Sequence, residues 1–126
     1  MDEQEFARTV AERTGLSRQE AADLTRATLE TLAHRLSPGE ARDLITELPE
    51  GLVDAVRRGT TDRIERFDLQ DTVQRVAGRT MLKEEEADRG VRTVLAVLRE
   101  AISEKEFNDL MSQLGKDFSQ ALESAG

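Results

Sequence analysis

Cysteine is absent from this sequence of 126 residues, and so are tryptophan and tyrosine. Without Cys the chain has no disulfide, no thiolate metal site and no cysteine nucleophile, which fits a reducing compartment. Four Phe are the only aromatic residues, so the core is expected to consist mainly of Leu, Val, Ile and Ala. With two Pro, eight Gly, 37% hydrophobic and 35% charged residues, the chain is expected to fold as one globular domain.

Long hydrophobic runs are also missing. No segment approaches the ~18 consecutive apolar residues that a transmembrane helix needs. The first six residues, MDEQEF, are acidic and polar, whereas a secretory signal starts with basic residues and continues with apolar ones. We therefore expect a cytoplasmic protein that has no membrane partner.

Positive charge is scarce: 18 Lys and Arg face 26 Asp and Glu, which gives a net charge of −8. A chain this acidic is repelled by a phosphate backbone unless its cations cluster, so nucleic acid is not the expected partner. One connecting segment does concentrate arginines, but Asp62 and Glu65 partly offset them and no aromatic residue lies between the arginines to provide base stacking. A solvated loop is the favoured interpretation, and a nucleic-acid contact is the alternative for Arg57, Arg58, Arg63 and Arg66.

Helix signals divide the first half of the chain into four short segments. Phe6 and Val10 lie four residues apart on one helical face, and Gly15 follows as a stop. The segments SRQE (17–20) and SPGE (37–40) are typical of capping boxes, in which Ser accepts from the amide three residues on and Glu reaches back. A shorter fourth helix is expected to open at a Pro and to end at a Gly, residues 49 and 59.

The second half repeats this pattern at a shift of 66 residues, without a gap. Matched positions are mostly caps and inward-facing residues, as expected when two copies keep one packing scheme. Ser37 and Glu40 fall on Ser103 and Glu106, for example. The prediction is an all-α helical bundle of two four-helix pseudo-repeats that form one domain. It assigns residues 1–126 to the domain, about 4–58 to the first repeat, 59–67 to the connector and about 68–124 to the second repeat.

The two halves differ along their longest predicted helix. Thr28 and Thr31 in the first half correspond to Val94 and Val97 in the second, which widens the apolar face to roughly 160°. So broad a face is expected either to lie at the centre of the fold, which is favoured, or to bind a partner. The residues of this face are Val91, Val94, Val97 and Leu98.

Nearly the whole chain resembles a known family of small prokaryotic proteins. The similar motifs are FARTVAERTGL (6–16), LSPGEARDL (36–44), LP (48–49) and VLAVLREAIS (94–103). They are similar to the domain-of-unknown-function family numbered two-two-six-seven. The resemblance implies an all-helical fold and no activity, so it assigns no functional residue. Lys83 stands where the pattern has a capping Ser, so a looser helix start is expected there.

A narrower resemblance covers residues 7–40. This stretch is similar to the first helical hairpin of the HU and IHF family of DNA-bending proteins, where the hairpin builds the dimer core. The family binds DNA through a β-sheet and basic arms, for which the present sequence has no equivalent segment after Glu40. The resemblance therefore implies packing and dimerisation and argues against DNA bending.

Few residues could support catalysis. His34 is the only histidine, and although it forms an i, i+4 pair with Glu30, both are expected to point to solvent without a third metal ligand. Ser17, Ser37 and Ser103 are accounted for as helix caps, and the glycines are too scattered to form a phosphate loop. We therefore predict no catalytic residue, no metal site and no cofactor, in a protein that is not an enzyme.

An acidic run, KEEEAD over residues 83–88, lies at a predicted helix start. Carboxylates there complement the helix dipole, which is the favoured interpretation. A site for a cation or for a basic partner is the alternative, although clustered carboxylates without a loop make a poor Ca²⁺ site.

The expected function is that of a non-catalytic interaction or scaffold module, with a second copy of the chain or another protein as its partner. One alternative is a nucleic-acid-associated protein that uses the arginines of residues 57–66. The other is a small-ligand carrier or an enzyme with a pocket between the repeats, which would need converging polar groups there.

Overall fold

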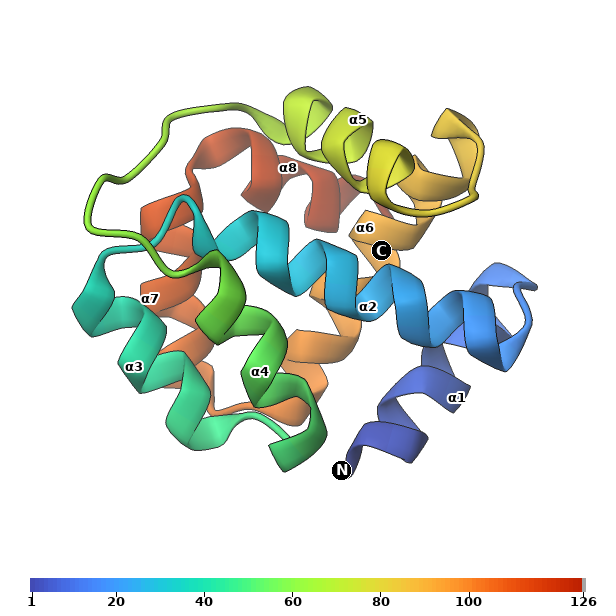
Figure 1. Ribbon diagram of the computed structural model, residues 1–126, viewed down its shortest axis with the longest axis horizontal. Helices are drawn as coiled ribbons and strands as arrows, with labels where there is room; N and C mark the ends of the chain where they lie inside the picture. Colours follow the sequence, from blue (N-terminus) through green and yellow to red (C-terminus); the bar gives the residue numbers. More distant parts are fainter. Residues whose placement is uncertain (126) are drawn as a thin grey trace.

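Eight helices account for most of the chain in the computed structural model, which describes residues 1–125 and the side chains of residues 1–123 (Figure 1). No strand occurs in residues 1–125, which confirms the predicted all-helical class. The helices are α1 (Glu3–Thr14), α2 (Arg18–Ala33), α3 (Pro38–Glu47), α4 (Glu50–Gly59), α5 (Leu69–Arg79), α6 (Glu84–Ala101), α7 (Glu104–Leu114) and α8 (Lys116–Ala125).

Helix starts follow the capping signals of the sequence in most cases. The Ser17 hydroxyl accepts from the Glu20 amide and the Glu20 carboxylate accepts from the Ser17 amide, so this capping box is complete. Asp68 caps α5 by accepting from the Asp71 amide at 2.8 Å. Lys83 has no side-chain cap, and its helix start is held only by the Glu86 carboxylate that accepts from the Lys83 amide.

The helices α2 and α6 lie at the centre of the fold and pack against each other. α1 lies against both of them, and so does α5. The expected broad face of α6 is part of this centre, because all four of its side chains are 0% exposed. Central burial is therefore the alternative that the structure shows, and a partner could reach these residues only if the core opened. They are Val91, Val94, Val97 and Leu98.

Two glycines permit the closest approaches between helices. A Cβ atom on Gly59 would lie 2.0 Å from the carbonyl oxygen of Glu30, so the end of α4 rests directly on the backbone of α2. A Cβ atom on Gly90 would lie 2.5 Å from a methyl carbon of Leu24, so α6 accepts a leucine of α2 at this point. Leu24 and Gly90 are equivalent positions in the 66-residue register and contact each other. A leucine at both positions would overpack this contact.

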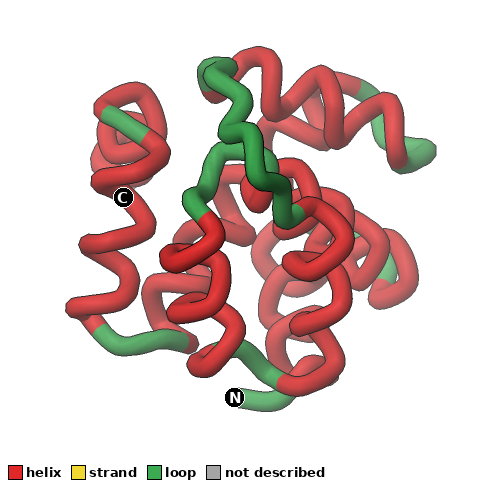
Figure 2. The backbone as a smooth tube through the Cα atoms, turned by 60° about the vertical axis from the view of Figure 1, so that its left-hand side comes forward, coloured by secondary structure: helices red, strands yellow, loops and turns green. Residues whose placement is uncertain are grey.

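The connector between α4 and α5 is the longest stretch without helix in residues 1–125, and Figure 2 shows it crossing the end of the bundle. Phe67 anchors it, because this ring is only 8% exposed. The Arg75 guanidinium lies 3.9 Å from the ring centroid and the Arg35 guanidinium lies 5.6 Å from it. The amide of Glu65 also donates to the carbonyl of His34 at 2.8 Å, which ties the connector to the end of α2.

The hydrogen bonds between α3 and α7 are reciprocal in the 66-residue register. The Ser37 amide donates to the Gln113 side chain at 2.9 Å, and the Ser103 amide donates to the Glu47 side chain at 2.7 Å. Each helix thus caps the start of the other, so the two run antiparallel. A twofold relation between the halves would produce this pattern, and the internal duplication itself stays a prediction.

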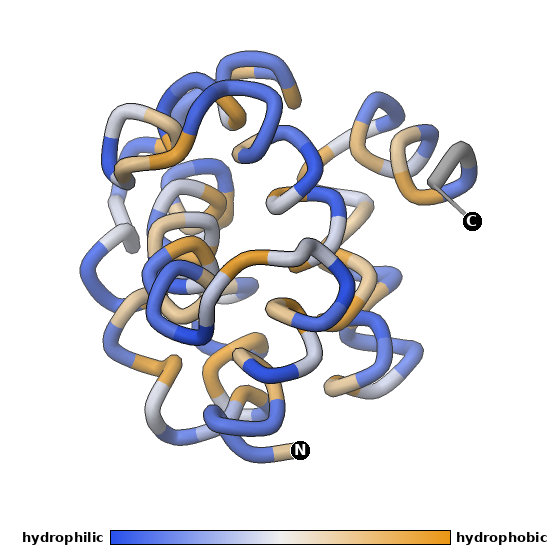
Figure 3. Tube along the Cα trace, turned by 90° about the vertical axis from the view of Figure 1, so that its right-hand side faces the viewer, coloured by the Kyte–Doolittle hydropathy of each residue, from blue (hydrophilic) through white to orange (hydrophobic). Residues whose placement is uncertain are grey.

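The last helix of each half is placed differently. α4 packs along much of α2, whereas α8 makes less contact with α6 and with α7. Figure 3 shows α8 at the edge of the molecule, with hydrophobic and hydrophilic positions alternating along it as in the other helices. Within the described chain, none of the helices has the length and apolar character that a membrane crossing would need.

Candidate functional site

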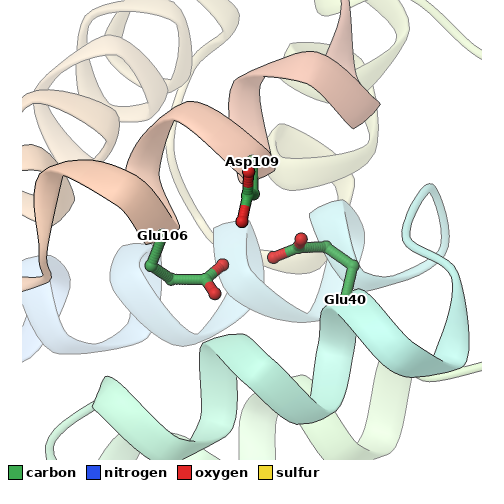
Figure 4. A group of neighbouring side chains, drawn as sticks. All are labelled: Glu40, Glu106 and Asp109. Atoms are coloured by element: carbon green, nitrogen blue, oxygen red, sulfur yellow. The ribbon is translucent and has the colours of Figure 1, made fainter.

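Three carboxylates from opposite helices converge in the seam between α3 and α7. Glu40 comes from α3, whereas Glu106 and Asp109 come from α7, one helical turn apart. Figure 4 shows their carboxyl groups pointing into a shared space between the two helices. One oxygen of each carboxylate lies within 4.8 Å of the corresponding oxygens of the other two.

The local capping pattern explains why these glutamates turn inward. The hydroxyls of Ser37 and Ser103 accept from the amides of Glu40 and Glu106, each at 3.2 Å, as a capping box predicts. The other half of each predicted box is wrong, because the Ser amides donate to side chains of the opposite helix instead. Neither glutamate is needed as an acceptor for its own helix start, so both side chains are free to enter the seam.

Burial controls the charge of this cluster. Glu106 is 4% exposed and Glu40 is 8% exposed. Desolvation, the hydrogen bond with Glu40 and the charge of Glu40 together raise the pKa of Glu106 to about 8. Desolvation also raises the pKa of Glu40, while the hydrogen bond from Glu106 opposes this shift. The raised pKa favours the protonated form of Glu106 near neutral pH, and in that form Glu106 donates a hydrogen bond to Glu40.

The cluster reaches solvent on the side of Asp109. This side chain is half-buried and accepts from the Lys105 ammonium group at 3.1 Å. Asp43, which the 66-residue register equates with Asp109, lies exposed on α3, and its negative charge raises the pKa of both glutamates. Lys105 is the cation that opposes this effect at Glu40.

A second feature is a groove between α5, α6 and α8, which we call the acidic groove. It encloses about 900 Å³, and its floor includes the buried side chains of Leu69 and Val73. Five carboxylates and two arginines stand around it, so its lining carries a formal charge of −3. The charged residues are Asp68, Glu84, Glu85, Asp88, Asp117, Arg89 and Arg92.

The carboxylates of the acidic groove differ in how they are engaged. Asp117 accepts from the amide of Leu69 at 2.7 Å, which joins α8 to α5. Asp88 pairs with Arg92 at 3.2 Å on the same helix. Glu84 accepts weakly from Gln70 at 3.4 Å, and within residues 1–123 no ion-pair partner is found for Glu85. Glu84 and Glu85 of α6 are thus the carboxylates most available to a ligand.

The arginines that sequence reasoning singled out remain at the surface and are spread along the chain. Arg57 and Arg58 lie in the last turn of α4, and Arg57 is 4.0 Å from Asp54. Arg63 and Arg66 follow in the connector and are exposed. A nucleic-acid role for these four arginines stays a prediction.

The His34 and Glu30 pair has other roles in the fold. The Glu30 carboxylate pairs with the Arg79 guanidinium of α5 at 3.3 Å. His34 caps the end of α2, and its carbonyl accepts from the connector. The interpretation of His34 as a residue without a metal role stays a prediction.

Sequence reasoning missed the role of Glu40 and Glu106. The signal was present, because both glutamates recur at the same place in the two halves, but a capping box accounts for the same spacing. Only the neighbouring helix shows that Gln113 and Glu47 replace them as acceptors. The acidic groove had a partial signal in the run of residues 83–88, for which a basic partner was the alternative interpretation.

The comparison with known families agrees with the resemblance seen in the sequence. A family model described as "Uncharacterized conserved protein (DUF2267)" matches residues 3–121. No curated protein matches the chain.

Proposed function

Since the chain belongs to the DUF2267 family, whose description names no activity, we propose from its geometry that it is a non-catalytic interaction module. The proposed ligand is a basic segment of a partner protein, bound in the acidic groove. The observation that carries this proposal is the concentration of five carboxylates around one hollow of about 900 Å³.

The chemistry of the groove suits arginine and lysine side chains. Their aliphatic stems can lie on an apolar floor such as Leu69 and Val73 while their charged ends meet carboxylates. Glu84 and Glu85 stand at the start of α6, and both are exposed. An arginine that replaces the weak contact from Gln70 would form a charge-assisted hydrogen bond, which is about twice as strong as a neutral one.

Binding of a labelled arginine-rich peptide, measured by fluorescence anisotropy at low salt, tests this function. The double variant Glu84→Gln, Glu85→Gln is expected to weaken binding by roughly tenfold, since each exposed ion pair contributes about 0.2–1 kcal/mol. The matched control is Glu5→Gln, Glu12→Gln, which removes the same charge from exposed positions on α1. Equal losses in the two variants, or no binding by the unmodified chain, would contradict the proposal.

A second copy of the chain is the alternative partner, and one observation favours it. The chain carries its own exposed arginine segment at residues 57–66, opposite in charge to the acidic groove. Light scattering would then detect self-association that salt weakens. Replacing the four arginines of this segment by Ala would abolish that association, whereas a strict monomer at micromolar concentration would exclude this partner.

A further inference from the structure

The oxygen geometry of the seam between α3 and α7 matches that of a cation site. Oxygens that coordinate Ca²⁺ lie about 2.3–2.6 Å from the ion and those of Mg²⁺ about 2.0–2.1 Å, so ligands on opposite sides are about 4–5 Å apart. The three carboxylates of Glu40, Glu106 and Asp109 offer oxygens that lie within 4.8 Å of one another. An ion placed between them would contact one oxygen from each carboxylate.

The buried oxygens of the seam provide an independent indication of a ligand. The Oε2 atoms of Glu40 and Glu106 are buried, and neither has a hydrogen-bond partner in the described part of the chain. Both side chains are more than nine-tenths buried and point into the cluster (Figure 4). Buried acceptors without a donor are costly, and a cation between them would satisfy both.

The charges around the seam favour a cation over an anion or a neutral molecule. Besides the three carboxylates, Asp43 and Glu47 of α3 add negative charge that acts on Glu106. Lys105 is the positive group that faces the cluster, and it is held by Asp109. We propose that Glu40, Glu106 and Asp109 bind a divalent cation that prefers oxygen ligands, of the Mg²⁺, Mn²⁺ or Ca²⁺ class.

Binding at this site is linked to Lys105. Its ammonium group must give up Asp109, whose half-buried carboxylate provides the route from solvent. Water completes the coordination, since three side chains are too few for these ions. The site joins α3 of the first half to α7 of the second and is independent of the acidic groove.

Titration of the full chain with Mn²⁺, after removal of metal by EDTA, tests the proposal by calorimetry and by electron paramagnetic resonance. One Mn²⁺ per chain is expected, with competition by Mg²⁺ or Ca²⁺. Asp109→Asn and Glu106→Gln are each expected to weaken binding at least tenfold. Asp43→Asn is the matched control, because it removes the same group at the register-equivalent, exposed position, and it is expected to change affinity by less than about threefold.

A further variant separates a true site from a general attraction of cations to an acidic protein. Lys105→Gln is expected to tighten Mn²⁺ binding severalfold, since it frees Asp109. Failure of the unmodified chain to bind Mn²⁺ would overturn the inference. So would equal weakening by Asp43→Asn and Asp109→Asn.

Discussion

The two halves of the molecule each carry a hollow at register-equivalent places, and the hollows differ in size and charge. The acidic groove encloses about 900 Å³, whereas its counterpart between α1 and α2 encloses about 370 Å³. All six residues that line the counterpart have their equivalents, 66 positions later, in the lining of the acidic groove. They are Glu3, Gln4, Ala7, Arg18, Gln19 and Ala22, and the equivalents are Leu69, Gln70, Val73, Glu84, Glu85 and Asp88.

This comparison separates what the halves share from what is specific to one of them. Equivalent helix pairs form the two hollows, α1 with α2 and α5 with α6, but Arg18, Gln19 and Ala22 correspond to three carboxylates in the second half. The packing of the last helix also differs, since α4 lies along α2 while Asp117 of α8 contributes to the acidic groove. The equivalent helix pairs provide a common scaffold, and the surface residues that differ between the halves provide the proposed binding chemistry.

The largest effect is expected where α4 meets α2, a contact that α8 does not reproduce to the same extent. Gly59→Ala would place a Cβ atom 2.0 Å from a backbone oxygen, so it is expected to cost about 3 kcal/mol of unfolding free energy. Gly78→Ala is the control, since nothing lies within 4 Å of a Cβ there and higher helix propensity should stabilise by about 0.5–1 kcal/mol. Urea unfolding measures both, and a neutral Gly59→Ala would contradict this packing.

In the seam between α3 and α7, the equivalent residues Glu40 and Glu106 of the two halves face each other. Their burial predicts that the free energy of unfolding depends on pH. The pKa of Glu106 is about 8 in the folded chain, compared with an ordinary value of 4.5. Between pH 4.5 and about 8 the unfolded chain binds fewer protons than the folded chain. The contribution of Glu106 to the free energy of unfolding is therefore fully present below pH 4.5 and is lost as the pH rises through about 8. Glu106→Gln should therefore be more stable than the unmodified chain at high pH.

Urea unfolding between pH 5 and pH 9, in the presence of EDTA, measures this difference. Glu106→Gln is expected to flatten the profile and to gain roughly 2 kcal/mol at the alkaline end, because a buried charge is removed. Glu104→Gln is a control on the same helix, at an exposed position. Parallel profiles for the unmodified chain and Glu106→Gln would exclude the shared proton.

Exchange of the linings tests whether charge alone distinguishes the two hollows. Glu84→Arg, Glu85→Gln and Asp88→Ala together give the acidic groove the residues of its counterpart at these positions. Peptide binding should fall by at least tenfold, about 1.4 kcal/mol. The reverse exchange at Arg18, Gln19 and Ala22 is expected to create no comparable binding, because that hollow is smaller. Binding gained there would show that charge suffices.

The smallest effect concerns the helix start that differs between the halves. Lys83 stands where Ser17 caps the equivalent helix of the first half and has no side-chain cap itself. Lys83→Ser should restore the hydroxyl acceptor and stabilise the chain by about 0.5–1 kcal/mol. Thermal unfolding measures the gain, with Lys116→Ser as a control at an exposed lysine. A loss of stability would indicate that Lys83 stabilises the fold by another route.

Much of the fold could be predicted from local sequence signals. The stop at Gly15, the complete capping box of Ser17 and the Asp68 cap all depend on residues within one or two turns. The same reasoning failed at Ser37 and Ser103, because acceptors 76 and 56 residues away compete there with the local glutamate. Local spacing predicts which backbone amides at a helix start need an acceptor, but it does not identify the acceptor when that residue is far away in the sequence.

The sequence alone determined the all-helical class, the helix boundaries signalled by caps and the aliphatic core, since these follow from short-range hydrogen bonding and hydrophobic periodicity. Only the tertiary structure decided that the broad face of α6 is buried against α2 and that Glu40 faces Glu106. It also decided that carboxylates from the cap of α5, from α6 and from α8, represented by Asp68, Glu84 and Asp117, surround one groove. Such groupings depend on how helices cross, and contacts between residues far apart in the chain fix the crossing.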